Sequence, residues 1–327
     1  LSGSSVSSAG DVNGDGLDDI IIAAPKANAS YVVFGSDTKK TAELDLSSLD
    51  GTNGFQINGE YSSSVSSAGD VNGDGLDDII IGQHISSPDA SSRKAGESYV
   101  IYGSDTWTRE EFNLSWINGK NGFKINGDKY KDSSGKSVSS AGDVNGDGID
   151  DLIIGAYNAG NDAGKSYIVY GSETRSTSEL DLSSLDGTNG FIINGIDEDD
   201  YSGYSVSSAG DVNADGFDDI IIGAYNAGNG GYNDYLSGEC YVVYGSDTST
   251  KYKLDLSSLD GTNGFIFEGR YSYDYTGKSV SSAGDVNGDG VDDLIIGAAN
   301  ADPGSNGGSI KGISNAGISY VVYGVAG

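Results

Sequence analysis

The sequence predicts an all-β chain built from five copies of one small sheet. The segment Asp-Val-Asn-Gly-Asp-Gly-Leu-Asp-Asp starts at Asp11, and close variants of it start at Asp70, Asp143, Asp211 and Asp285. Each copy follows the run Ser-Val-Ser-Ser-Ala-Gly and precedes an apolar run rich in isoleucine. A long unit repeated at near-regular spacing indicates a repeat architecture, so the repeat decides the fold.

Each of the first four copies contains the signals of four strands, and the fifth contains those of three. In the first copy we predict strands at residues 5–10, 19–23, 31–35 and 54–59, with the repeated Asp-rich loop between the first two. These runs are β-branched or alternating and are bounded by Gly and Asn, as strands are. A segment before the fourth strand, residues 44–51, is expected to hold a single helical turn that ends at its glycine.

The five units favour radial repetition, which is a β-propeller of five blades. Small residues in the first strand suit an innermost position, and the aromatic and Ile-rich strands then pack blade on blade. A β-helix solenoid is less suitable because the units are large and hairpin-like. We predict one domain over residues 1–327. Its expected blades are residues 1–59, 60–127, 128–195, 196–269 and 270–327.

The last predicted blade contains only three strands, ending at residues 320–324. Its outer strand is either lacking, supplied by a further segment of chain, or supplied by another molecule. An uncovered strand edge is a pairing site. Self-association through this edge is therefore one expectation.

The repeated loop has the composition of a calcium site. Carboxylate or amide side chains occupy loop positions 1, 3, 5 and 9, and position 6 is a glycine that permits a sharp turn. This spacing directs several oxygens inward, as a hard cation with about six to eight oxygen ligands requires. We expect five calcium ions, one per blade, with the main-chain carbonyl of position 7 as a further ligand. The expected ligands are Asp11, Asn13, Asp15, Leu17 and Asp19; Asp70, Asn72, Asp74, Leu76 and Asp78; Asp143, Asn145, Asp147, Ile149 and Asp151; Asp211, Asn213, Asp215, Phe217 and Asp219; Asp285, Asn287, Asp289, Val291 and Asp293.

Other interpretations of the loop fit less well. An EF-hand needs a bidentate Glu at position 12, where every copy here has an isoleucine such as Ile22. A metal-free turn would leave three carboxylates per loop to repel one another. Magnesium prefers to keep water ligands, whereas this loop offers many protein oxygens. The fourth copy has Ala214 where the others have Gly, so we expect a weaker site there.

Composition limits the partners. The formal net charge is −31, with 49 acidic against 18 basic residues, which argues against nucleic acid and anionic membranes as partners. No apolar stretch approaches the roughly 18 residues of a transmembrane helix. The single cysteine permits no disulfide within the chain, so calcium is expected to take the stabilising role that disulfides often play outside cells.

The residues of the first copy resemble a known family. The run Gly-Asp-Val-Asn-Gly-Asp-Gly-Leu-Asp-Asp-Ile-Ile-Ile-Ala-Ala-Pro at residues 10–25 is similar to the FG-GAP repeat of integrin alpha-subunit propellers and their bacterial relatives. The resemblance implies calcium in the loop between strands one and two of each blade. The near-identical, Cys-poor repeats are closer to a bacterial surface protein than to an animal receptor. We therefore expect an extracellular or cell-surface protein.

Nothing in the sequence indicates an active site. The only histidine, His84, occupies a loop position where other copies have Pro, Tyr or Ala, and no nucleophile motif accompanies it. The abundant carboxylates are already assigned to calcium. A non-enzyme is therefore expected.

A binding role is expected instead, on the face opposite the calcium loops. Strand order places the two-to-three and four-to-one connections there, and loops on a rigid scaffold commonly carry function. The variable loops span residues 83–97, 157–165, 225–239 and 299–318, and the tyrosines expected there are Tyr61, Tyr130, Tyr201, Tyr204, Tyr232, Tyr235, Tyr271, Tyr273 and Tyr275. Tyrosine with Asp and Asn suits either a protein or a glycan ligand. Three functions remain open: cell adhesion or protein–protein interaction, carbohydrate binding as a lectin, and a structural module that self-assembles.

Overall fold

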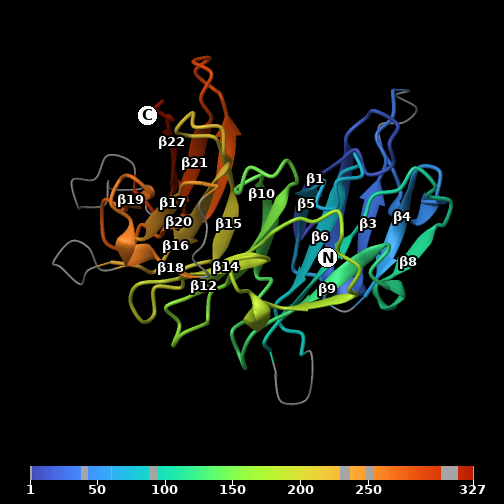
Figure 1. Cartoon of the computed structure of the whole chain (residues 1–327), viewed down its shortest axis with the longest axis horizontal. Helices are drawn as coiled ribbons and strands as arrows, with labels where there is room; N and C mark the ends of the chain where they lie inside the picture. The colour runs from blue at the N-terminus through green and yellow to red at the C-terminus, as the bar shows by residue number, and fades with distance from the viewer. Residues whose placement is uncertain are drawn as a thin grey trace. The chain divides into compact units, whose positions relative to one another are not determined.

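Five small β-sheets contain the strands of the described part of the chain. The computed structural model describes residues 2–37, 43–59, 61–87, 94–228, 236–247, 253–302 and 316–326. Within these residues the chain forms the strands β1 to β22 and five single-turn 3-10 helices (Figure 1). The chain divides into two compact units, Leu1–Ser140 with Gly171–Ser184, and Ala141–Tyr170 with Leu185–Gly327.

The first unit contains two five-stranded sheets. In both, four antiparallel strands follow one another in sequence order and a short fifth strand lies outside them. The first sheet consists of β1 (Ser5–Gly10), β2 (Asp19–Ala24), β3 (Ala29–Val33), β4 (Gly54–Asn58) and β8 (Glu111–Asn113). The second consists of β5 (Ser64–Gly69), β6 (Asp78–Gln83), β7 (Glu97–Ile101), β9 (Gly122–Asn126) and β13 (Glu179–Asp181).

The third sheet follows the same five-stranded plan, and the last two sheets have fewer strands. The third sheet is β10 (Ser137–Gly142), β11 (Asp151–Ala156), β12 (Lys165–Val169), β14 (Gly190–Asn194) and β18 (Lys253–Asp255). The fourth is β15 (Ser205–Gly210), β16 (Asp219–Ala224), β17 (Glu239–Val243) and β19 (Gly264–Glu268). The fifth is β20 (Thr276–Gly284), β21 (Asp293–Ala298) and β22 (Ile318–Val322).

The outermost strands β8, β13 and β18 are a feature that the sequence did not predict. Each comes from the repeat after the one whose sheet it joins, and each pairs in parallel with the fourth strand, as β8 pairs with β4. In Figure 1 the green β8 accordingly lies beside the blue β4. These three-residue strands cross the predicted blade boundaries, so neighbouring repeats are linked by shared sheets as well as by packing. The boundaries themselves remain a prediction.

The predicted helical turn is present as the 3-10 turn η2 (Leu46–Ser48). Its equivalents η3 (Leu114–Trp116), η4 (Leu182–Ser184) and η5 (Leu256–Ser258) directly follow the short strands β8, β13 and β18. A further 3-10 turn, η1 (Pro25–Ala27), follows β2. In η2, the Asp45 side chain accepts a hydrogen bond from the Ser47 N–H and so caps the turn.

The hydrophobic cores lie between neighbouring sheets. One core joins Ile21 and Phe55 of the first sheet with Ile79 and Ile101 of the second. The second strand of the middle sheets, for example β6, is buried along its whole length, which explains its unbroken apolar run. The prediction of an all-β fold with five propeller-type blades, the last without its outer strand, is confirmed. No helix in the described residues is both long and apolar enough to cross a membrane.

Candidate metal loops and ligand surfaces

Each predicted calcium loop connects the first and second strands of its sheet. In the first copy Gly10 at the end of β1 pairs with Asp19 at the start of β2, which closes the intervening residues into a turn. Gly14 and Gly16 have positive φ angles of 74° and 84°, in the left-handed region that glycine adopts without strain. The structure therefore brings the five predicted ligand residues of each copy into one loop.

The position-1 aspartate organises the loop. One oxygen of Asp11 accepts hydrogen bonds from the N–H groups of Gly14 and Asp15 at 2.7 and 3.1 Å, and the other accepts from Gly16 at 2.8 Å. Asp70, Asp143 and Asp285 make the same three contacts in their copies. The loop backbone thus wraps around a carboxylate.

The fourth loop departs from this pattern at Ala214. Asp211 accepts hydrogen bonds from Asp215 and Gly216, as in the other copies. Ala214 itself has a φ angle of 60°, where its Cβ makes the left-handed conformation costly. This agrees with the expectation of a weaker fourth site, which remains a prediction.

The position-9 aspartate is buried beneath each loop. Asp19 accepts hydrogen bonds from the Val12 N–H at 3.0 Å and the Gly35 N–H at 2.7 Å. Burial raises the pKa of Asp19 to about 6, that of Asp78 to about 8 and that of Asp219 to about 7. The neighbouring carboxylates of positions 5 and 1 add to each rise in pKa. In these three loops burial therefore disfavours the ionised carboxylate relative to that of an exposed aspartate.

The chemical types of the loop's ligand atoms suit a hard cation. Within the described residues, no Lys or Arg forms an ion pair with Asp11, Asp15 or Asp19, so the first loop lacks a protein counter-charge. Carboxylate, amide and main-chain oxygens are the ligands that calcium takes. However, no group of three or more His, Cys, Asp or Glu side chains is arranged to hold a metal ion in the part of the chain that the structure describes. Calcium therefore remains a proposal.

The position-8 aspartate links neighbouring loops, a role that the sequence did not indicate. Asp77 in the second loop accepts a hydrogen bond from the N–H of Asp11 in the first loop at 2.8 Å. The Asp77 N–H in turn donates to the Asp11 carbonyl at 3.2 Å. Asp218 bonds Asp143, and Asp292 bonds Asp211, in the same two-way manner. In these three pairs, the position-8 aspartate of one loop holds the main chain of the position-1 aspartate in the loop before it.

Gly10 makes this approach possible. A Cβ atom there would overlap the Asp77 carboxylate, and the Gly10 φ of 70° already favours glycine. The same overlap would occur at Gly142 with Asp218 and at Gly210 with Asp292. At Gly284, which precedes the last loop, an added Cβ would meet no atom within 4 Å. The repeated sequence thus includes a glycine that loop-to-loop contact requires.

The His84 side chain forms a hydrogen bond with a serine hydroxyl. Its Nδ1 lies 2.7 Å from the Ser63 Oγ, and its ring packs near Tyr61. Burial, together with the charges of Lys136 and Lys94, lowers the His84 pKa to about 4. In the described residues no carboxylate hydrogen-bonds to the ring, so the pair lacks the orienting third group of a catalytic triad.

Tyrosines gather where the two-to-three and four-to-one connections of the second unit meet. Tyr225 lies at the centre, with ring centroids 4.5 Å from Tyr204, 5.8 Å from Tyr201 and 5.7 Å from Tyr275. Tyr157 contacts both Tyr201 and Tyr204. Burial raises the Tyr225 pKa to about 12. We call these five residues the tyrosine cluster.

The exposed Lys278 extends over the tyrosine cluster. Its Nζ lies 4.8 Å from the Tyr225 ring centre and 5.5 Å from that of Tyr275, within the range of cation–π attraction. Tyr201 and Tyr275 have positive φ angles of 57° and 54°, which non-glycine residues rarely adopt. Of the other predicted tyrosines, Tyr130 and Tyr273 are exposed, whereas Tyr232 and Tyr235 lie outside the described residues.

Each of the five sheets carries its own copy of the same hairpin loop. The chain is therefore a repeat protein with β-propeller blades. The FG-GAP repeat family matches residues 2–35, 62–101, 134–169, 202–237 and 276–322, which together make up more than half of the chain. The chain therefore belongs to the FG-GAP repeat family, and the resemblance seen in the sequence is confirmed.

Integrin alpha chains are among its relatives. Integrin alpha pat-2 of Caenorhabditis elegans is 31% identical over 231 residues, which are 67% of this chain and 18% of the relative. Integrin alpha-4 of Xenopus laevis is 28% identical over 168 residues, or 51% of this chain and 14% of the relative. The chain thus spans less than a fifth of the length of either integrin.

Two further similarities concern enzymes. The phosphatidylinositol-glycan-specific phospholipase D of Dictyostelium discoideum is 27% identical over 317 residues, 88% of this chain and 31% of the relative. The crystal structure of the intramolecular trans-sialidase from Ruminococcus gnavus in complex with oseltamivir carboxylate matches with a TM-score of 0.41 and 14% identity, over 94% of this chain and 51% of the other. This low structural similarity supports no statement about the fold or function of the chain.

Proposed function

We propose that this chain is a calcium-stabilised, non-enzymatic module of a secreted or cell-surface protein, with a role in adhesion or protein–protein interaction. The observation that carries the proposal is the fivefold recurrence of one oxygen-rich loop in a chain of the FG-GAP family. Similarity to integrin alpha chains supports the adhesive role. The near-identical copies and single cysteine favour a bacterial surface protein.

Calcium has a structural role in this proposal. Residues at positions 1, 3, 5, 7 and 9 of each loop would hold one ion, and the ion's charge would offset the repulsion among the carboxylates. Because position 8 of one loop bonds position 1 of the preceding loop, ordering one loop would help to order its neighbour. Metal binding to the folded form alone would then raise stability.

The tyrosine cluster is the candidate adhesive surface. It combines half-exposed aromatic rings with the exposed Lys278, and tyrosine supplies large contact area at low conformational cost. Tyr201 and Tyr275 have left-handed backbone conformations, which are strained for residues other than glycine. Because strained residues concentrate at binding sites, this conformation supports a binding role for the two tyrosines. This end of the sheets is where we predicted a protein or glycan partner.

A bead adhesion assay tests the proposal. Beads carrying the whole chain should bind to bacterial or host cells in calcium, detach in chelator and rebind when calcium returns. Beads carrying Tyr225→Ala should bind less, whereas beads carrying Leu44→Ala, a control at an exposed residue outside the tyrosine cluster and the variable loops, should bind as the parent does. Melting curves in calcium check that both variants fold. Binding no better than that of an unrelated acidic protein would refute the adhesive role.

Self-assembly is a second candidate function. The outer edges of β19 and β22 carry no further strand among the described residues, and Val321 and Tyr323 near the last edge are 48% and 60% exposed. An unprotected edge favours pairing with another strand. The remaining alternative, carbohydrate binding, is favoured by a separate pocket in the first unit.

A further inference from the structure

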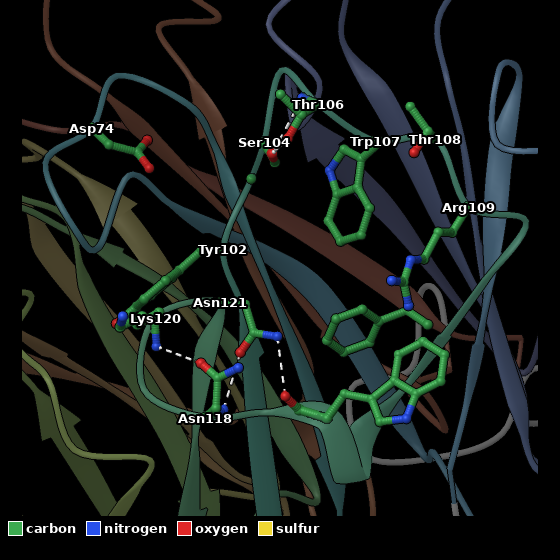
Figure 2. A pocket seen from close by; sticks show the side chains of 13 residues that line it. Asp74, Tyr102, Ser104, Thr106, Trp107, Thr108, Arg109, Asn118, Lys120 and Asn121 are labelled. Atoms are coloured by element: carbon green, nitrogen blue, oxygen red, sulfur yellow. Dashed lines mark hydrogen bonds between the residues drawn. The ribbon is translucent and has the colours of Figure 1, made fainter.

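One repeat departs from its sister copies at positions that line a single cavity. Residues 44–54, 180–190 and 254–264 all read Leu-Asp-Leu-Ser-Ser-Leu-Asp-Gly-Thr-Asn-Gly, whereas residues 112–122 read Phe-Asn-Leu-Ser-Trp-Ile-Asn-Gly-Lys-Asn-Gly. The cavity measures about 450 Å³ and lies in the first unit (Figure 2). Four of the six changed residues line it: Phe112, Trp116, Asn118 and Lys120.

Aromatic rings form one side of the cavity and are held firmly. Trp107 stacks on Phe55 with centroids 4.3 Å apart and meets the Phe112 ring edge-on at 5.8 Å. Phe112 in turn meets Trp116 at 6.0 Å. Trp116 remains 45% exposed, and the Arg109 guanidinium lies 5.4 Å from its ring centre. The cavity thus offers an apolar ring face beside a cation.

Polar groups form the opposite side. Asn121 donates from Nδ2 to the Trp116 carbonyl at 3.1 Å and accepts from the Asn118 N–H at 3.0 Å. The Asn118 side chain accepts from the Lys120 N–H at 3.0 Å, which fixes the turn that presents Lys120. Figure 2 shows these residues and Tyr102 facing Trp107 and Arg109 across the cavity. The Trp107 Nε1 is buried and has no hydrogen-bond partner among the described residues.

The charge of the lining is opposite to that of the chain. Sister copies have Asp50, Asp186 or Asp260 where this repeat has Asn118, and threonine where it has Lys120. The lining therefore gains a cation and loses a carboxylate in a chain whose net charge is −31. Arg109 adds a second cation, and the one acidic residue in the lining is Asp74 of the second loop. An anionic ligand is favoured here.

We propose that this cavity binds a carboxylate-bearing sugar residue, such as the uronic or sialic acid unit of an acidic glycan. The exposed face of Trp116 stacks against the C–H face of the sugar ring, which aromatic side chains bind well. Arg109, which lies beside the Trp116 ring, binds the sugar carboxylate, and Arg is suited to bidentate binding of such a group. Lys120 on the other side of the cavity adds a second positive charge. The cavity belongs to the first unit and the tyrosine cluster to the second, and the proposal stands whether or not the chain is adhesive.

Tryptophan fluorescence measures occupancy directly, because the chain contains two tryptophans and both line the cavity. The intact chain, in a fixed calcium concentration, is titrated with tri-galacturonic acid, a hyaluronan tetrasaccharide and sialyllactose. The methyl esters of the three ligands are the neutral controls. We expect saturable quenching or a blue shift with at least one acid and an affinity about tenfold lower for its neutral partner.

The sister repeats supply a variant that keeps the fold. Lys120→Thr with Asn118→Asp restores residues that form the same turn in three other copies and leaves both tryptophans in place. It should weaken acid binding by about tenfold or more, and Arg109→Thr should do likewise. The control Lys129→Thr, outside the cavity, should bind normally. The proposal is overturned if all three acids leave the fluorescence unchanged, if acid and ester bind equally, or if the sister-repeat variant keeps full affinity.

Discussion

Removing the Asp77 carboxylate tests the link between neighbouring loops. Asp77→Ala deletes the acceptor that lies 2.8 Å from the Asp11 N–H and leaves a gap against Gly10. A hydrogen bond to a charged group contributes about 1.5–3 kcal/mol to stability. Because Asp77 is only half-buried and the change also relieves repulsion among carboxylates, we expect the free energy of unfolding to fall by about 1–2 kcal/mol.

Differential scanning calorimetry in saturating calcium measures this loss. A change of about 1–2 kcal/mol lowers the melting temperature of a unit of this size by roughly 2–8 °C. Asp77→Asn retains an acceptor oxygen and should keep much of the stability. Asp18→Ala is the matched control, because Asp18 holds the same loop position but is exposed and accepts no hydrogen bond among the described residues. Equal effects of Asp77→Ala and Asp18→Ala would refute the reasoning.

Three other predictions follow from the loops and the last sheet. Excess chelator should lower the melting temperature in a calcium-reversible way, because each loop then leaves its carboxylates uncompensated; an unchanged melting curve would contradict the stabilising role. Ala214→Gly should stabilise the calcium-bound chain by about 1 kcal/mol by removing left-handed strain, with Ala209→Gly, at a buried strand position, expected to destabilise instead. Light scattering should detect concentration-dependent association that Val321→Lys reduces, and a monomeric mass at high concentration would exclude it.

Local sequence patterns predicted most of the fold. The antiparallel strands of each repeat, the hairpin loops and the 3-10 turn all depend on residues close in sequence, such as the isoleucine run of β2 and the capping Asp45. The strand β8 was missed because three residues are too short to display periodicity and because its partner β4 belongs to another repeat. Non-local pairing of this kind has little local signature.

At the functional sites, too, features that depend on local sequence were predicted and contacts between distant residues were not. Spacing alone predicted loop positions 1 and 9 as calcium ligands, and that assignment stays a prediction. The role of Asp77 has no such signal, because it depends on a contact with Asp11, a residue 66 positions away. The cavity around Trp116 did have a sequence signal, which was the departure of one repeat from three identical sisters. Comparing internal copies position by position would have located it before the structure was known.

The number of calcium ions bound per chain is the most direct test of whether each of the five loops binds one ion. Isothermal titration of chelator-stripped protein with calcium, with the count checked by equilibrium dialysis, yields this number. We expect five ions per chain, with the loop at Ala214 filling last. Folded protein that binds no calcium would contradict the proposed role of the loops, whatever partner the chain recognises.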